Sequence, residues 1–309
     1  MLKGKDLLSI HDLTSDEVME ILNLAHELKA KQKAGIEHHI LKGKTLGMIF
    51  EKTSTRTRVS FEVGMYQLGG QALFLSNRDL QIGRGEPIKD TARVLSRYLD
   101  GVMIRTFGHE IVEEFAQYAS IPVINALTDL LHPCQALTDL LTAQEHKGKD
   151  LKGLKMAYIG DGNNMTHSLM YACAKVGMNF ASASPKGYEP NAQVVANAKL
   201  DAAQSGSTIE ILNDPFAAAK DADILYTDVW ASMGQEAEHD ERVKIFKDYQ
   251  INNELLSVAD KRAIVMHCLP AHRGEEIAED VLEKNANVIF DEAENRLHTQ
   301  KAIMALLMG

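Results

Sequence analysis

Apolar residues recur along this chain at two spacings, one typical of amphipathic helices and one of short buried strands. Thr14 and Glu17 have the spacing of an N-terminal capping box, and apolar residues follow it at helical intervals at Val18, Ile21, Leu22, Ala25 and Leu28. Further along, short apolar runs predict strands at 45–50, 72–75, 101–105 and 122–125. Between them, the pattern predicts helices at 54–70, 88–99 and 112–119.

A second alternation of the same kind follows a helix predicted at 135–146. Its strands are predicted at 155–160, 209–211, 224–227, 263–266 and 288–290, and a terminal helix is predicted at 303–308. Alternating strands and helices indicate mainly parallel sheets with helices on both faces. We therefore predict an α/β protein of two doubly wound domains, each with a mainly parallel sheet, joined by helices that include the one after His132.

Length and charge narrow the class of protein. The 309 residues suit two domains of about 150 residues each. The net charge of −10 argues against a general nucleic-acid surface, which is basic. No run approaches the ~18 apolar residues that span a bilayer, and the N-terminus shows no apolar run of signal-peptide length.

Cysteine usage points to a reducing compartment. The three cysteines, Cys134, Cys173 and Cys268, are widely separated and show neither a disulfide framework nor a zinc spacing. We therefore expect a cytoplasmic protein that works without a metal and without nucleic-acid or membrane partners.

A hydroxyl-rich and arginine-rich segment stands at the end of the first strand, where ligands of open α/β sheets gather. Ser54-Thr55-Arg56-Thr57-Arg58 follows that strand and opens a helix. The N–H groups of a helix N-terminus attract anions, and hydroxyls with an arginine fork suit phosphate. An ordinary N-cap with a solvated basic turn is the alternative, and the lack of P-loop glycines argues against a nucleoside triphosphate.

Two more strand ends carry groups that can polarise a carbonyl. Arg105 ends a buried-looking strand, and His132-Pro133-Cys134-Gln135 follows another. The guanidinium and the imidazole would donate to a carbonyl oxygen, while Gln135 would bind an adjacent NH2 group. A surface ion pair for Arg105 and a structural role for His132 are the alternatives.

The segment Gly160-Asp161-Gly162-Asn163-Asn164-Met165 contains the first two glycines of a dinucleotide-binding loop. Met165 replaces the third glycine, and no acidic residue ends a convincing strand about 20 residues later. A nicotinamide cofactor is therefore disfavoured, and the asparagines become candidates for binding polar parts of a small substrate.

The remaining candidates are an aspartate, a cysteine and an arginine. Asp228 follows an apolar strand and could hold a substrate ammonium, with helix capping as the alternative. Cys268, within His267-Cys268-Leu269-Pro270, is a candidate for proton transfer, although a buried thiol is usually just a small hydrophobe. Arg296 stands among acids near the C-terminus, where an ion pair is its ordinary role.

Three of these segments together resemble the signature segments of the aspartate/ornithine carbamoyltransferase family: 54–58, 132–135 and 267–270. They occur in the family's order and at similar spacing, and the resemblance spans nearly the whole chain. The segment Asp228–Gly234 resembles the family's ornithine-binding loop, where aspartate-specific members usually carry an arginine, and Cys268 also resembles the ornithine branch. The resemblance implies transfer of a carbamoyl group from carbamoyl phosphate to the δ-amine of L-ornithine, in arginine metabolism, without a cofactor.

The resemblance also implies a division of labour. Residues 1–133 plus a C-terminal helix at about 292–309 would form the carbamoyl phosphate-binding domain, and residues 134–291 the ornithine-binding domain. Carbamoyl phosphate would be bound by Ser54, Thr55, Arg56, Thr57, Gln81, Arg105, His132, Gln135, Cys268, Leu269 and Arg296. Ornithine would be bound by Asn164, Asp228, Ser232 and Met233, and the catalytic residues would be Cys268, Arg105, His132 and Asp228.

Gln81 has a separate implication. It matches a loop that in this family reaches into a neighbouring subunit's site, which implies a homotrimer or an assembly of trimers. The residue at this position varies among relatives.

Three other functions stay open on the sequence alone. The first is a carbamoyltransferase that uses putrescine or N-acetylornithine, although Asp228 and the loop 232–234 favour an acceptor with a free α-amino group. The second is a nicotinamide-dependent oxidoreductase built on the Gly160 loop. The third is a non-catalytic binding or regulatory subunit, which should have lost charged or nucleophilic positions that are all present here.

Overall fold

The structure, a computed structural model, describes residues 2–309, and the chain divides into two compact units. Unit 1 comprises the chain up to Leu141 together with Asn295–Gly309, and unit 2 comprises Thr142–Glu294. Both divisions fall inside helices, α5 (Pro133–Lys147) and α12 (Ala286–Met308), so each of these helices continues from one unit into the other. The sequence predicts the corresponding domain boundaries after residue 133 and at about residue 292.

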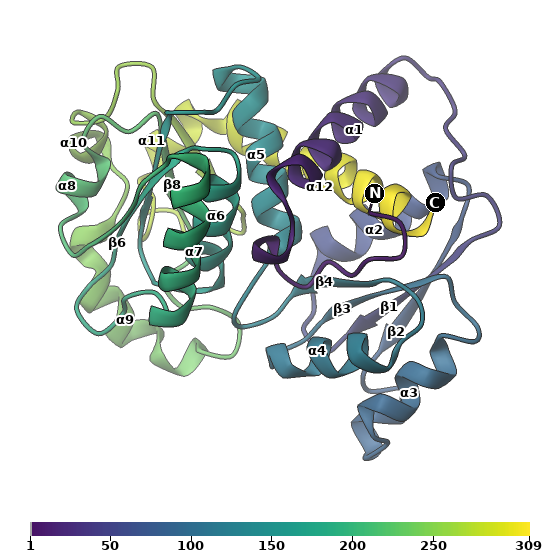
Figure 1. Cartoon of the computed structure of the whole chain (residues 1–309). Coiled ribbons are helices and arrows are strands. Elements are labelled where there is room, and N and C mark those ends of the chain that lie inside the picture. The colour runs from purple at the N-terminus through teal and green to yellow at the C-terminus, as the bar shows by residue number, and fades with distance from the viewer. Residues whose placement is uncertain (1) are drawn as a thin grey trace. The chain divides into compact units, whose positions relative to one another are not determined.

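Unit 1 is built on a four-stranded parallel sheet (Figure 1). Its strand order is β2-β1-β3-β4, and the strands are β1 (Thr45–Phe50), β2 (Gln71–Ser76), β3 (Gly101–Arg105) and β4 (Val123–Leu127). The strand order reverses between β1 and β3, which pair with Phe50 opposite Arg105. In open α/β sheets, such a switch point opens a ligand-binding crevice at the carboxyl ends of the strands.

The helices of unit 1 alternate with its strands. They are α1 (Ser15–Lys33), α2 (Thr55–Gln67), α3 (Ile88–Leu95) and α4 (His109–Tyr118), with 3-10 turns η1 (Ile10–Asp12) and η2 (Ile82–Arg84). The predicted capping box of α1 is confirmed, because Thr14 Oγ1 accepts from Glu17 N at 3.2 Å and Glu17 Oε2 accepts from Thr14 N at 3.0 Å. The helix predicted at 88–99 ends earlier, at Leu95.

Unit 2 is built on a five-stranded parallel sheet of order β7-β6-β5-β8-β9. The strands are β5 (Lys155–Ile159), β6 (Asn179–Ala183), β7 (Ile209–Leu212), β8 (Ile224–Thr227) and β9 (Ile264–His267). The helices are α6 (Asn164–Lys175), α7 (Ala192–Ser205), α8 (Pro215–Ala219), α9 (His239–Phe246), α10 (Asn253–Leu256) and α11 (Glu279–Lys284), with 3-10 turns η3 (Glu236–Glu238) and η4 (Lys247–Tyr249). Its switch point lies between β5 and β8.

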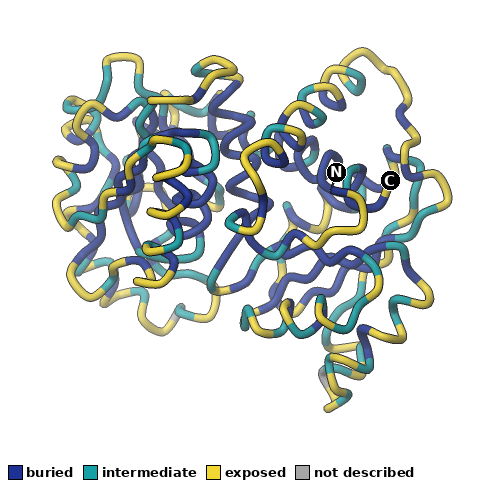
Figure 2. Tube along the Cα trace, viewed as in Figure 1, coloured by how far each residue is buried: buried dark blue, intermediate teal, exposed yellow. Residues whose placement is uncertain are grey.

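The sheets carry the cores of both units, as Figure 2 shows by burial. All five residues of β3 and all four of β8 are buried. Strands covered on both faces are expected to be nearly continuous apolar runs, which is why short apolar runs predicted them. The predicted fold class, two mainly parallel α/β domains joined by helices, is confirmed.

One predicted element is wrong. Residues 288–290 belong to α12 and form no strand. Val288 and Ile289 are buried while Phe290 is 57% exposed, so the three apolar residues point around a helix. A short apolar run does not distinguish a strand from a helix by itself. Strand β6 was not among the predicted strands, because its Ala-Ser-Ala sequence is weakly apolar.

Helix α12 is the longest of the described helices, and its sequence contains charged residues such as Glu292, Arg296 and Lys301. Within residues 2–309, no helix combines the length and the apolar character needed to cross a bilayer.

Candidate active site

The hydroxyl-rich segment after β1 forms the N-terminus of α2, at the switch point of unit 1. Ser54 is the N-cap: its Oγ accepts from Thr57 N at 3.2 Å and donates to Thr57 Oγ1 at 3.1 Å. Thr55 is exposed and Arg56 is half-buried in the first turn. The N-cap role weighed as an alternative is therefore real, and it also fixes the helix end whose N–H groups and dipole attract anions.

Three buried side chains from distant parts of the chain join at this helix end. Arg296 Nη1 donates to Gln135 Oε1 at 2.6 Å, and Arg296 Nη2 donates to Thr57 Oγ1 at 3.1 Å. Gln135 Nε2 in turn donates to Asp139 Oδ1 at 2.8 Å. Thr57, Gln135 and Arg296 are each at most 3% exposed. Helices α12, α5 and α2 are thus tied together by a buried arginine.

The electrostatics of His132 show that further arginines converge here. Arg105, the last residue of β3, is buried, and so is His132, directly before α5. Burial holds the pKa of His132 well below its usual range, and Arg296, Arg105 and Arg56 lower that pKa further. The imidazole is therefore neutral at ordinary pH, so it can polarise a carbonyl without carrying a charge.

Gln81 does not join this cluster. It is exposed, directly before η2, where its backbone carbonyl accepts from Arg84 N at 2.8 Å and Glu86 N at 3.0 Å. Within residues 2–309, no hydrogen bond joins the Gln81 side chain to the cluster around His132.

In unit 2, strand register explains how an aspartate meets a cysteine. Thr227 of β8 pairs with His267 of β9, so the next residues, Asp228 and Cys268, emerge side by side at the carboxyl edge. Cys268 Sγ lies 3.1 Å from Asp228 Oδ1, which also accepts from Val229 N at 2.8 Å. Asp228 is buried and Cys268 is half-buried, so a thiol and a carboxylate face each other at the edge of the sheet.

The other carboxylate oxygen of Asp228 is met by Asn163, one of the two asparagines that the sequence offers as substrate-binding candidates. Asn163 Nδ2 donates to Asp228 Oδ2 at 3.3 Å, while Asn163 Oδ1 accepts from Met165 N at 2.9 Å and Tyr158 Oη at 3.3 Å. Asn163 is the N-cap of α6, and Asn164 is the first residue of that helix, half-buried. The two neighbouring asparagines were the available signal, and the sequence did not distinguish their roles.

A buried acid holds the segment that carries Cys268. Leu269 N donates to His267 Nδ1 at 2.8 Å, and His267 Nε2 lies 3.0 Å from Glu276 Oε1, with His267 and Glu276 fully buried. Leu269 adopts a left-handed backbone at φ 57°, a strained conformation for a leucine. Glu276 had no recognisable signal in the sequence, because its partner is determined only by the fold.

The loop after β8 stands partly in solvent. Met233 is 43% exposed, and Ser232 is half-buried, with its N–H donating to Gln235 Oε1 at 3.0 Å. Among the described residues, no hydrogen bond joins Ser232 to Asp228. The loop is fixed by Arg242, which donates to the Trp230 carbonyl at 2.9 Å and to Asp161 Oδ2 at 3.0 Å.

The glycine loop of unit 2 is filled by the protein itself. A Cβ added at Gly162 would lie 2.4 Å from the backbone carbon of Glu189 and from the nitrogen of Pro190. In dinucleotide-binding loops, this second glycine lets the backbone approach the pyrophosphate. Here the space is taken by residues 188–190, which argues against a nicotinamide cofactor at this position.

Comparisons with protein families match both halves of the chain. The family model described as "Aspartate/ornithine carbamoyltransferase, carbamoyl-P binding domain" matches residues 5–145. The model described as "Aspartate/ornithine carbamoyltransferase, Asp/Orn binding domain" matches residues 152–307.

Individual relatives agree over the full length. The chain is 62% identical to an ornithine carbamoyltransferase of Anoxybacillus flavithermus over 99% of this chain and 98% of the relative. Among solved structures, it is similar to the ornithine carbamoyltransferase from Pyrococcus furiosus, with a TM-score of 0.96 and 56% identity over 100% of this chain and 98% of that one. The anabolic ornithine carbamoyltransferase from Campylobacter jejuni matches with a TM-score of 0.91 and 45% identity over 97% of both chains.

Proposed function

This chain belongs to the aspartate/ornithine carbamoyltransferase family, and from this premise we propose that it transfers the carbamoyl group of carbamoyl phosphate to the δ-amine of L-ornithine. The products are L-citrulline and phosphate. The observation that carries the proposal is the cluster in unit 1, where Arg56, Arg105 and Arg296 all act on one buried neutral histidine, His132. Such a cluster suits a doubly charged phosphate with a carbonyl attached.

The phosphate end is assigned to the N-terminus of α2. Ser54, Thr55 and Thr57 offer hydroxyls and N–H groups, and Arg56 in the same turn offers a charged fork. The buried guanidinium of Arg296, held by Gln135 and Thr57, adds a second positive charge that water screens little. Gln81, from its exposed loop, would contribute from the neighbouring subunit.

The carbamoyl end is assigned to Arg105, His132 and Gln135. Attack on the carbonyl carbon places negative charge on its oxygen, and preorganised donors aimed at that oxygen stabilise the transition state. Because His132 is neutral, one ring N–H donates while Arg105 supplies the charge. The amide oxygen of Gln135 accepts from Arg296, and the amide nitrogen of Gln135 donates to Asp139.

The acceptor end is assigned to unit 2. Asp228 would hold the α-ammonium of ornithine, with Asn164, Ser232 and Met233 around the amino-acid end. Asn163 holds Asp228 in place at 3.3 Å, which makes it a positioning residue. Cys268 and the backbone of Leu269 would lie beside the reacting δ-amine, with the thiol oriented by Asp228 at 3.1 Å.

The reaction needs a neutral amine, although a free alkylammonium has a pKa near ~10.4. The δ-nitrogen forms a bond to the carbonyl carbon, the carbon–oxygen bond to phosphate breaks, and the amine loses one proton. Cys268 and Asp228 would orient the amine and take part in removing that proton. Phosphate leaves with its charge already balanced by Arg56 and the end of α2. The chemistry requires no redox step.

A product assay with four amines tests the proposal. The purified protein is mixed with carbamoyl phosphate and, separately, ornithine, N-acetylornithine, putrescine or aspartate. We expect citrulline from ornithine and no carbamoylated product from the other three. Product from a different amine would keep the reaction and overturn the acceptor. A folded protein that carbamoylates none of them would overturn the catalytic proposal in favour of a binding or regulatory role.

We further propose that the chain works as a homotrimer or an assembly of trimers. Support comes from large apolar side chains that unit 1 leaves exposed: Val59, Tyr66, Leu73, Phe74, Val94 and Tyr98. Contiguous exposed apolar surface is typical of protein interfaces, and these residues lie on both sides of Gln81 in the sequence. Sedimentation equilibrium should give three chains or a multiple of three, and a monomer at micromolar concentration would contradict the proposal.

We also propose that the reaction takes place in the cytoplasm and in arginine biosynthesis. The chain carries three free thiols, Cys134, Cys173 and Cys268, and thiols persist in a reducing compartment. Deleting the gene from its host should then create a requirement for arginine or citrulline that ornithine does not relieve. Growth without either supplement would contradict this assignment.

A further inference from the structure

Away from the candidate active site, two histidines and a glutamate of unit 2 converge at the surface. His239 is the first residue of α9, and His272 and Glu275 lie between β9 and α11. His239 Nε2 lies 3.1 Å from Glu275 Oε2, and His272 Nδ1 lies 3.4 Å from the same oxygen. The three ligand atoms all lie within 4.8 Å of one another.

The two distances to Glu275 Oε2 match the edge of a tetrahedral coordination shell. Zinc binds imidazole nitrogen and carboxylate oxygen at about 2.0–2.2 Å in tetrahedral geometry, so two of its ligand atoms stand about 3.3 Å apart. Both measured distances to Glu275 Oε2 lie close to that edge. The side chains of His239, His272 and Glu275 are 36%, 43% and 29% exposed. An ion from solvent can therefore reach them.

The surrounding contacts hold the three ligands in place. His239 Nδ1 lies 3.3 Å from Asp240 Oδ1, the carboxylate–histidine arrangement that orients metal-binding imidazoles. His272 N donates to the buried Glu276 Oε1 at 2.7 Å, and Glu275 N donates to the His272 carbonyl at 2.9 Å. The Glu275 carbonyl also accepts from Gln250 Nε2 at 2.8 Å. The loop is thus braced at several points before any ion binds.

A second group with metal-ligand chemistry, Asp228, His267 and Cys268, is less suitable. Both ring nitrogens of His267 are already engaged, Nδ1 by Leu269 N at 2.8 Å and Nε2 by Glu276 Oε1 at 3.0 Å. Its Asp228–Cys268 pair also belongs to the candidate active site. The surface group is the better candidate because its ring nitrogens point at a shared acid.

We propose that His239 Nε2, His272 Nδ1 and Glu275 Oε2 form a binding site for a divalent transition-metal ion such as Zn²⁺ or Co²⁺, with water completing the shell. Two imidazoles and one carboxylate select these borderline ions over Mg²⁺ and Ca²⁺, which prefer oxygen ligands. The site goes beyond the proposed carbamoyl transfer and does not depend on it. An ion there connects the start of α9, which follows the loop 232–234, to the segment that follows Cys268.

The test uses the full-length protein without any polyhistidine tag and titrates it with Co²⁺ alone, followed by absorption, and with Zn²⁺ alone, followed by calorimetry. The titrations are made at about pH 8, where imidazoles are largely neutral. We expect one equivalent to bind, with cobalt bands that lack a sulfur-to-metal charge-transfer band. Losing a ligand in His239→Ala or Glu275→Gln should weaken binding by more than the 10–100-fold typical of losing an outer-shell partner.

Two variants serve as controls. His39→Ala removes an exposed histidine whose Nδ1 lies 3.9 Å from Glu37 Oε2, and it should leave binding unchanged. Cys268→Ser should also leave it unchanged, and circular dichroism checks that each variant is folded. Hydrogen exchange in residues 236–246 should slow when Zn²⁺ is added to the wild-type chain. The proposal is overturned if no metal binds, if His239→Ala and Glu275→Gln both bind normally, or if binding disappears with Cys268.

Discussion

The two candidate clusters are built in different ways. In unit 1, Thr57, Gln135 and Arg296 are buried side chains on three helices, and each is at most 3% exposed. In unit 2, Asp228 and Cys268 project from loops that follow two neighbouring strands, and Met233 in the same loop as Asp228 is 43% exposed. One cluster is held by helix packing and the other by strand register plus a few loop contacts.

The difference matches what each cluster is proposed to bind. Carbamoyl phosphate is small and highly charged, and buried preorganised charges act on it with little screening. The acceptor amine must be distinguished from similar amines, and loops on a rigid sheet can change that choice without disturbing the core. We therefore expect substitutions in the unit 1 cluster to affect carbamoyl phosphate most strongly, and loop substitutions in unit 2 to affect ornithine.

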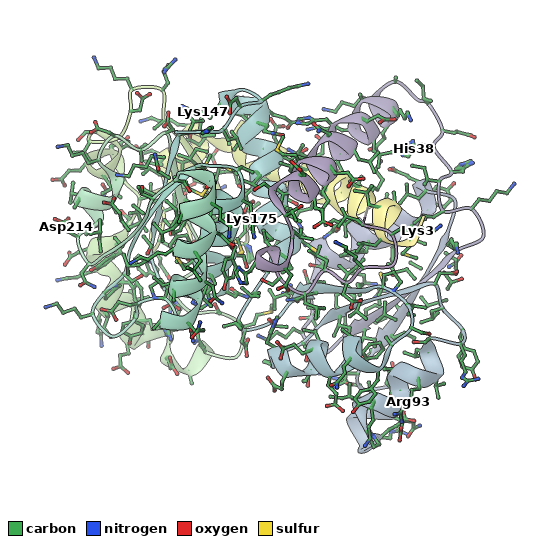
Figure 3. All side chains as sticks on the ribbon, viewed as in Figure 1. Lys3, His38, Arg93, Lys147, Lys175 and Asp214 are labelled. Carbon is green, nitrogen blue, oxygen red and sulfur yellow. The ribbon has the colours of Figure 1, made fainter. Side chains whose placement is uncertain are left out.

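The largest expected effect is that of Arg56→Ala. Removing a charged partner of the phosphate should cost about 3–4 kcal/mol, which raises the KM for carbamoyl phosphate ~10²–10³-fold. The fold should survive because Arg56 is only half-buried. Steady-state kinetics measure the effect. Arg93→Ala is the matched control, because Arg93, labelled in Figure 3, is a surface arginine. Its Nη1 lies 3.2 Å from Asp90 Oδ1, and the substitution should leave KM unchanged. A near-normal KM for Arg56→Ala would refute the phosphate assignment.

Cys268→Ser should have a smaller effect, and on kcat. A general base contributes about 10²–10⁴-fold, and the serine hydroxyl keeps the contact with Asp228, so we expect kcat to fall about 10–10²-fold. The KM for carbamoyl phosphate should change little. Cys173→Ala is the control, because that thiol packs between Met156 and Met178. If the pH profile of Cys268→Ser matches that of the wild type in shape and height, the thiol is structural.

Much of this picture was readable from the sequence, for a physical reason. Buried parallel strands are short apolar runs, so the sequence predicts β1, β3 and β8 and the polar residues that follow them. Ser54, Arg105 and Asp228 stand at such strand ends, and three segments in family order made the resemblance specific. The family and the fold class are confirmed, while the roles of the individual site residues stay predictions.

Other parts could not be read from the sequence, because they depend on long-range packing. Nothing in the sequence near Glu276 indicates that it is buried against His267, and Asn163 was indistinguishable from Asn164 before the helix α6 was placed. Residues 288–290 were predicted as a strand because an apolar run has no period of its own.

We also expect a pH effect on the unit 2 cluster that the unit 1 cluster does not share. Burial raises the pKa of Asp161 to about 6, although Arg242 opposes the shift. Above that pH the carboxylate is charged and pairs with Arg242 at 3.0 Å, and below it the pair weakens. Because Arg242 also holds the Trp230 carbonyl before the loop 232–234, the KM for ornithine, calculated for its neutral δ-amine form, should rise as the pH falls through about 6, by roughly fivefold for ~1 kcal/mol.

Initial rates from pH 5 to 8 would measure this effect. Asp161→Asn should show the raised KM at every pH, with no inflection near the pKa of about 6. Asp214→Asn, which changes the exposed N-cap of α8, should behave like the wild type. The prediction fails if the wild type and Asp161→Asn have parallel pH profiles.

The smallest expected effect concerns Lys301, a second buried cation of α12, five positions after Arg296 in the sequence. Its Nζ lies 2.8 Å from Gln67 Oε1, 3.1 Å from His38 Nε2 and 3.4 Å from Gln32 Oε1, and none of these partners is a carboxylate. Burial lowers the pKa of Lys301 to about 8. Between that pH and the unfolded value of ~10.4, the unfolded chain binds the proton that the folded chain has lost, so this group makes the free energy of unfolding rise with pH.

Lys301→Met should therefore lose that rise while it keeps full activity. Urea unfolding at pH 7.5, 8.5 and 9.5 would compare the two proteins, and the wild type should gain relative to the variant by at most ~1.4 kcal/mol per pH unit. A difference that stays constant with pH would show that Lys301 keeps its unfolded pKa. Arg296→Met offers the opposite signature, because arginine stays charged throughout: carbamoyl transfer should be impaired without a pH-dependent change in stability. The same helix would then carry one buried cation used for binding and one that only tunes stability.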